Sequence, residues 1–293
     1  MRITQNIIYN TYVSDMMRRQ ASIYETSLQL ATGKRVNKPS DDPVNASKIL
    51  SSKSLMSSYG QYEKNIDSGL SYLSMAEQTL GSVKDLLIKI QETAVSESTG
   101  TADAVSRANA ATLTSGMYDQ FLSLANTSYD GKYIFGGYKT ATSPFDTAGA
   151  YSGDANKHRI MIGAGNYVTI GVNGGEVFKG AGGGTDIFQT ITDLTTALNA
   201  NDQAGVQASI GSLEAAFSQV SNAVSDIGGK VTRLTDAQSD MSSLKVELAA
   251  MISGLEDVDL AKVMTELQLD QVALQAAMTS AGNVFRVNIF DYI

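Results

Sequence analysis

Apolar residues recur at helical spacing along most of the chain, and the longest such run lies in the second half. From residue 206 to residue 255 they alternate steps of four and three, with one polar turn between Leu234 and Met241. This alternation is typical of the seam of a coiled coil or a long bundle helix. Gly228 and Gly229 each disfavour helix by roughly 1 kcal/mol. The phase continues across them, so we predict a flexible point within one helix.

A second long helix is predicted from residue 43 to about residue 96, where apolar residues follow one another at steps of three, four or seven. Asp42 can accept hydrogen bonds at its start, and Pro43 suits a first helical position. The same spacing predicts a shorter helix that carries Ala110 to Leu124, and another from about residue 186 to residue 200.

Between these helices the pattern changes to short β-like runs separated by glycine-rich turns. The runs are residues 132–135, 159–162, 167–170 and 176–178. Asn173-Gly174-Gly175, between the last two, is a typical hairpin turn signal. We therefore predict a small β-rich insertion. The glycines at 180–184 lack the Gly-Lys-Ser/Thr ending of a phosphate-binding loop, which favours a plain flexible turn.

Both ends of the chain carry apolar residues at steps of mainly three, four and seven. They are either ordinary core helices of a bundle or halves of an assembly interface that lacks its partner. Burial of a large apolar side chain contributes roughly 1.5–3 kcal/mol, whereas ordering the backbone costs about 1–2 kcal/mol for every residue. We expect such an arm to stay mobile in the monomer until neighbours bury it. The candidate interface residues are Ile8, Tyr12, Met16, Ile23, Leu30, Leu260, Val263, Leu267, Leu274, Met278, Ala281, Phe285 and Ile289.

These patterns together predict a mainly α fold, in which a long helical bundle or coiled-coil stalk is built from both termini and carries the β-rich insertion. The expected domains are a terminal helical assembly domain of residues 1–42 with 256–293, a long-helix bundle of residues 43–128 with 201–255, and the insertion at residues 129–200.

Composition removes several classes of function. The net charge is −8 and the basic residues are scattered, which argues against nucleic acid. No apolar stretch is long enough to span a membrane. There is no cysteine and a single histidine, His158, which excludes thiolate nucleophiles, zinc ribbons and HExxH sites. We expect an ordinary surface histidine there, and no catalytic, cofactor, metal or small-molecule site. The first residues lack the apolar core of a secretory signal.

Three segments carry a family resemblance. Residues 31–43, ATGKRVNKPSDDP, resemble the loop that follows the first helix in the flagellin superfamily. Residues 130–140, DGKYIFGGYKT, followed by SPF at 143–145, are similar to a segment of the hook-associated protein 3 family within that superfamily.

The third segment is the C-terminal one. It runs from EDVDLA at 256–261 through LQAA at 274–277 to NIFDYI at 288–293, and it also resembles the hook-associated protein 3 family. Residues 150–200 resemble no characteristic segment. The three segments occur in the family's order and span both ends of the chain and the start of the insertion.

This resemblance implies a structural protein of the bacterial flagellum, not an enzyme. It implies a junction subunit between the hook-associated zone and the filament, assembled through coiled-coil packing of its terminal helices. The implied partners are hook-associated protein 1, flagellin, identical subunits in a ring, and an export chaperone before secretion. The implied location is extracellular, reached by type III export without a cleaved signal. A filament flagellin and, more distantly, a secreted coiled-coil adhesin are the alternatives.

Overall fold

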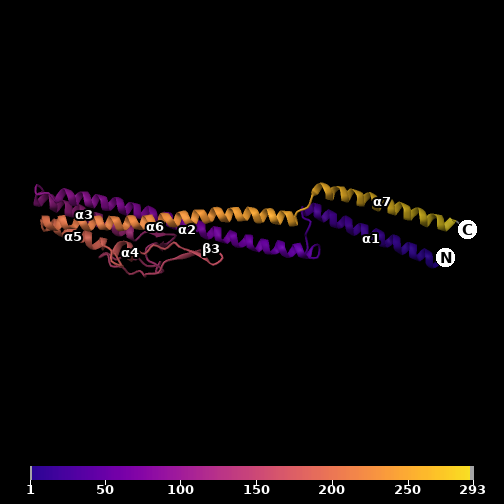
Figure 1. Ribbon diagram of the computed structural model, residues 1–293, viewed down its shortest axis with the longest axis horizontal. Helices are drawn as coiled ribbons and strands as arrows, with labels where there is room; N and C mark the ends of the chain where they lie inside the picture. The colour runs from indigo at the N-terminus through magenta and orange to yellow at the C-terminus, as the bar shows by residue number, and fades with distance from the viewer. Residues whose placement is uncertain (1, 291–293) are drawn as a thin grey trace. The chain divides into compact units, whose positions relative to one another are not determined.

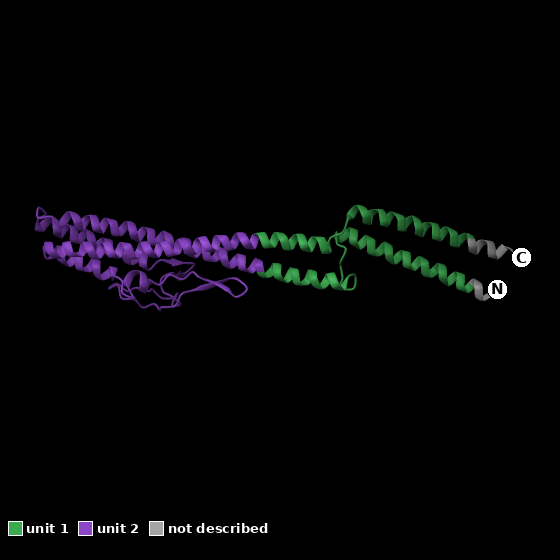
Figure 2. Cartoon of the chain, viewed as in Figure 1, with its two compact units in different colours: residues 1–58, 243–293 green, residues 59–242 purple. Residues whose placement is uncertain are grey.

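The structure is a computed structural model that describes the backbone of residues 2–290 and the side chains of residues 6–283. It is mainly α, as the spacing of apolar residues predicts. The chain forms two compact units (Figure 2): unit 1 comprises residues 1–58 and 243–293, and unit 2 comprises residues 59–242. The division into three domains made from the sequence stays a prediction.

Two helices contribute to both units, namely α2 (Pro43–Glu97) and α6 (Gln203–Glu256) (Figure 1). The two long helices predicted from the sequence are thus confirmed, and α6 continues through Gly228 and Gly229 without a break. The shorter predicted helices are α3 (Ala104–Ala125) and α5 (Ile187–Asn199).

In unit 2 the core of the long helices has heptad spacing. Four fully buried residues of α2 lie seven apart, and four of α6 do the same. A strict seven-residue repeat keeps one seam turned toward the partner helix, as in a left-handed coiled coil. A hydrogen bond of 2.6 Å from Gln238 Nε2 to Asp67 Oδ1 also joins the two helices. The heptad residues are Ile66, Leu73, Leu80 and Leu87 on α2, and Leu213, Val220, Ile227 and Leu234 on α6.

The insertion holds two antiparallel hairpins, β1–β2 and β3–β4. Strands β1 (Ser128–Tyr129) and β2 (Lys132–Tyr133) are short, whereas β3 (Arg159–Gly163) and β4 (Asn166–Thr169) realise two of the predicted β-like runs. The predicted run at 132–135 is strand only in its first half, because Ile134 and Phe135 leave the ladder and enter the core.

The prediction of a strand at residues 176–178 is wrong, and so is the hairpin turn before it. These residues belong to helix α4 (Gly174–Lys179). The Asn173 side chain accepts a hydrogen bond of 3.1 Å from the backbone nitrogen of Glu176 and so caps that helix. Asparagine suits both turns and helix N-caps, so the dipeptide pattern alone did not distinguish them.

A cluster of five fully buried phenylalanines attaches the insertion to the helices of unit 2. The rings of Phe121 on α3 and Phe188 on α5 have centroids 4.6 Å apart, and Phe135 and Phe178 have centroids 4.9 Å apart. Phe145 contacts both Phe178 and Phe188. Edge-to-face pairs of this kind add to the stabilisation from burial itself.

Unit 1 is built around a pair of terminal helices, α1 (Arg2–Thr32) and α7 (Leu260–Phe290). Ser22 Oγ on α1 donates a hydrogen bond of 2.7 Å to Asp270 Oδ2 on α7. Beside the pair, a small apolar cluster joins the start of α2 to the end of α6. Its members are Val36, Ala46 and Ile49, with half-buried Ile252 and Leu255 against them.

The two loops of unit 1, from α1 to α2 and from α6 to α7, are joined at Glu256. The backbone nitrogen of Arg35 donates a hydrogen bond of 2.7 Å to the Glu256 carbonyl, and that of Val258 donates one of 3.1 Å to the Gly33 carbonyl. The Glu256 carboxylate is almost buried and forms ion pairs with Lys34 at 2.8 Å and Lys53 at 2.7 Å.

Burial raises the pKa of Glu256, but the two lysines more than offset that and hold the pKa below its ordinary value of 4.5. The hydrogen bond and charge of Glu256 in turn raise the pKa of Lys34 above 10.5. The charged pair therefore stabilises unit 1 at neutral pH.

The aromatic cluster generates the first prediction. Phe188→Ala removes a ring that contacts several others, so we expect a loss of about 3–5 kcal/mol in the free energy of unfolding of unit 2. Phe217→Ala, at a half-buried position of α6, is the matched control and should cost clearly less. Urea unfolding followed by circular dichroism measures both, and equal losses would contradict the assignment of the cluster as the anchor.

The Glu256 junction generates the second prediction. Because the folded pKa of Glu256 is depressed, its stabilisation is present above 4.5 and is lost as the pH falls through the lower, folded value. Glu256→Gln should therefore reduce hydrogen-exchange protection of the Arg35 and Val258 amides at pH 7, and the difference from the unmodified chain should shrink as the pH falls below 4.5 through the lower, folded pKa of Glu256. A difference that stays the same size over this pH range would show that the carboxylate charge plays no part.

Candidate assembly surface

The α1–α7 pair of unit 1 brings most of the predicted interface residues together within one chain. Of those on α1, all but Ile8 are at least half-buried in the α1–α7 pair, and those on α7 include Val263 and Ala281, which are 3% and 5% exposed. The other members of this inner seam are half-buried: Tyr12, Met16, Ile23 and Leu30 on α1, and Leu267 and Leu274 on α7.

Other predicted interface residues lie outside the inner seam. Ile8, Leu260 and Met278 are 42%, 49% and 59% exposed, so they lack apolar cover within the chain. The side chains of Phe285 and Ile289 lie outside the described residues. Participation of all these side chains in an assembly interface remains a prediction.

Helix α1 also carries a second apolar stripe, which the sequence analysis did not identify. We call it the outer stripe. Its residues lie at steps of four, four, three and four: Val13, Met17, Ala21, Tyr24 and Leu28. Met17 is 67% exposed and Tyr24 is 66% exposed. Val13, Met17 and Tyr24 directly follow the inner-seam residues Tyr12, Met16 and Ile23. The outer stripe is therefore turned from the inner seam by about 100°, the rotation of one residue in an α-helix.

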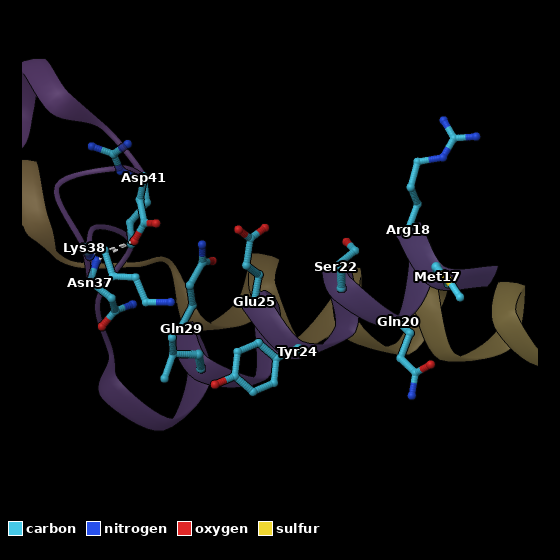
Figure 3. Close-up of a pocket in the computed structure, with 13 residues that line it drawn as sticks. Met17, Arg18, Gln20, Ser22, Tyr24, Glu25, Gln29, Asn37, Lys38 and Asp41 are labelled. Carbon is cyan, nitrogen blue, oxygen red and sulfur yellow. Dashed lines mark hydrogen bonds between the residues drawn. The ribbon is translucent and has the colours of Figure 1, made fainter. Parts of the chain in front are cut away.

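The outer stripe ends in a groove of about 850 Å³ between α1 and the loop that follows it (Figure 3). Met17, Ala21, Tyr24 and Leu28 supply the apolar part of its lining. Charged and polar side chains of α1 and the loop make up the rest. They include Arg18, Glu25, Gln29, Arg35, Asn37, Lys38 and Asp41.

The loop is held rigidly by its own side chains. Asp41 Oδ2 accepts hydrogen bonds from the backbone nitrogens of Asn37 at 3.0 Å and Lys38 at 2.8 Å (Figure 3). Asp42 caps α2 by accepting from the Asn45 backbone nitrogen at 3.1 Å, and this bond lowers the pKa of Asp42. Gly33 adopts a φ of +69°, a conformation that glycine reaches without strain.

Helix α7 offers further apolar side chains to solvent. Met264, Leu269 and Val272 are 54%, 64% and 66% exposed. Leu260 and Met278 are also largely exposed, at 49% and 59%. Exposed apolar residues gathered on two neighbouring helices mark an interaction surface, whereas single ones are ordinary.

The segment at residues 130–145, which carries part of the family resemblance, lies in unit 2 and has a packing role. Its Phe135 and Phe145 belong to the phenylalanine cluster. Gly137 has a φ of +68°, and an added Cβ there would come within 2.6 Å of the Asp154 carbonyl oxygen. The segment is therefore a close-packed turn that attaches the insertion.

The structure places His158 half-buried beside Tyr138, with ring centroids 4.9 Å apart. Within the described part of the chain, no three or more His, Cys, Asp or Glu side chains gather in a way that could hold a metal ion. None of the described helices combines the length and apolar character needed to cross a membrane.

Comparisons with known proteins match this chain to proteins of the bacterial flagellum. The N-terminal helical region of bacterial flagellin matches residues 3–140, and its C-terminal helical region matches residues 210–293. The chain is 28% identical over 314 aligned residues to flagellar hook-associated protein 3 of Salmonella typhimurium, with 99% of each chain covered. It is also 26% identical to the flagellin of Bacillus subtilis, with 100% of each covered.

A structure assigned to a flagellar hook-associated protein of Vibrio parahaemolyticus has the same fold, with a TM-score of 0.69 at 23% identity. It covers 74% of this chain and 100% of that one. The relatives are structural proteins of the flagellum, which confirms the prediction that the chain is not an enzyme. Since the two flagellin regions together match most of its length, the chain belongs to the bacterial flagellin family and is a structural component of the flagellum.

Proposed function

We propose that this chain is the junction subunit that connects the hook-associated zone of the flagellum to its filament. The observation that carries the proposal is the match to hook-associated protein 3, which covers 99% of both chains. The characteristic segment at residues 130–145 adds support, because its glycines and phenylalanines fix the attachment of the insertion in unit 2.

Assembly in this proposal occurs through unit 1. The inner seam joins α1 to α7 within one subunit, and the outer stripe of α1 and the exposed residues of α7 meet neighbouring subunits. Each large apolar side chain so buried contributes roughly 1.5–3 kcal/mol. Met17 and Tyr24, each about two-thirds exposed, are the largest exposed residues of the stripe.

The proposed neighbours are identical subunits in a ring, hook-associated protein 1 on the hook side and flagellin on the filament side. An export chaperone binds the chain before type III secretion, which needs no cleaved signal and delivers the protein outside the cell. Residues 1–42 with 256–293 form the assembly domain, residues 43–128 with 201–255 the bundle outside it, and residues 129–200 the solvent-facing insertion.

A filament flagellin is the second candidate, because the Bacillus subtilis flagellin also matches over its full length. Electron microscopy of cells that carry a labelled chain distinguishes the two. Label confined to the base of the filament supports the junction role, and label along the whole filament contradicts it. A deletion strain should be non-motile and release flagellin monomers, whereas normal motility would favour a role outside the flagellum.

The third prediction concerns the outer stripe. Tyr24→Asp introduces a charge that assembly must desolvate without a partner. Since Tyr24 is 66% exposed, the isolated chain should keep its thermal stability while the variant fails to restore motility to a deletion strain. Val105→Asp is the matched control, because Val105 is 69% exposed but lies on α3 in unit 2.

Leu267→Asp tests the inner seam in the same strain. Leu267 is half-buried against α1, so this substitution should weaken the α1–α7 pair as well as block assembly. Normal filaments on cells that express either Tyr24→Asp or Leu267→Asp would show that the terminal helices do not build the junction.

A further inference from the structure

The methionine side chains of this chain differ in exposure between its two units. With no cysteine and 11 methionines, all of its sulfur chemistry belongs to thioethers. Among the side chains that the structure describes, the largely exposed methionines are Met17, Met251, Met264 and Met278, at 67%, 50%, 54% and 59%, and all four lie in unit 1. The methionines of unit 2 are half-buried: Met75, Met117, Met161 and Met241.

Three of the exposed thioethers lie on the candidate assembly surface. Met17 lines the groove of α1. Met264 and Met278 are separated by two heptads on α7, so they lie along the same edge of that helix. Met251 belongs to α6, where its sulfur lies 3.8 Å from Ser52 Oγ, and it is not part of this surface.

We propose that Met17, Met264 and Met278 are sites of reversible oxidation to methionine sulfoxide, which blocks assembly while the subunit is free. This inference rests on the proposed junction function. The oxidant class is a peroxide. One peroxide oxygen is transferred to the thioether sulfur and the O–O bond breaks. With hydrogen peroxide, the other oxygen leaves as water. The sulfur loses two electrons and the peroxide gains them.

The product is a strong hydrogen-bond acceptor on a surface that must lose its water. Sulfoxide formation makes a flexible apolar side chain polar, and its burial without a donor opposes association. Assembly covers the same side chains and so protects them. A sulfoxide reductase restores the thioether: two thiols supply two electrons and are oxidised to a disulfide, and the sulfoxide oxygen leaves as water. The switch therefore acts on free subunits and not on finished junctions.

The test uses the full-length chain and hydrogen peroxide. Peptide mass spectrometry follows sulfoxide formation at each methionine, and Met17, Met264 and Met278 should oxidise about tenfold faster than Met75 and Met117, in line with their exposure. Treated and untreated chains are then added to cells that lack the gene, and restored filaments are counted by electron microscopy. Treated chain should restore far fewer, and reductase treatment should recover the count.

The decisive variant is Met17→Leu with Met264→Leu and Met278→Leu, which keeps side-chain volume and removes the sulfur. Its filament count is compared only with that of the same variant left untreated, and the two counts should be equal. The control, Met75→Leu with Met117→Leu, should remain sensitive. If the triple variant does not assemble even untreated, a chain with norleucine at every methionine replaces it. Its filament count should then be the same with and without peroxide.

Equal oxidation rates in both units, or a triple variant that loses activity as fully as the unmodified chain, would overturn the inference. If treated and untreated unmodified chains restore filaments equally, the inference fails and the junction role stands. If the untreated chain restores none, both fail.

Discussion

A pair of helices can bury only the faces that the two helices turn toward each other, and this constraint governs unit 1. Helix α1 carries two apolar stripes, of which α7 covers the inner one. Met17 and Tyr24 of the outer stripe stay largely exposed, as do Met264 and Val272 on α7. In unit 2 the heptads of α2 and α6, the phenylalanine cluster and α5 pack into one continuous buried core. We therefore propose that unit 1, which leaves these apolar residues exposed, is the part through which the subunit assembles.

Periodicity predicted the long helices because a helix that is buried on one side carries apolar residues at regular steps of three and four. The search for periodicity missed the outer stripe, because Val13 and Met17 directly follow inner-seam residues. A search for one seam in each helix does not separate such neighbours into a second stripe. Periodicity also mistook the Asn173 cap for a turn, because asparagine serves both purposes. The Glu256 junction could not be predicted, because its lysines lie far from it in the sequence and only the fold brings them together.

The segments that carry the family resemblance have identifiable structural roles. In the loop after α1, Gly33 allows the helix to end, Lys34 pairs with Glu256, and Asp42 starts α2. In the insertion, Gly137 permits a close approach to Asp154. These residues fix backbone geometry within the chain. They therefore bear on the fold of the family and not on the choice of a partner.

The joining of the two loops at Glu256 also sets an order of events. The hydrogen bond from Arg35 to the Leu255 carbonyl spans 220 positions of the chain, and the entropy of closing a loop increases with its length. Contacts of such wide sequence separation form slowly. When the chain is synthesised from its N-terminus, residues 59–242 are complete before α7 is made. Helix α1 therefore cannot pair with α7 until the last helix has been synthesised.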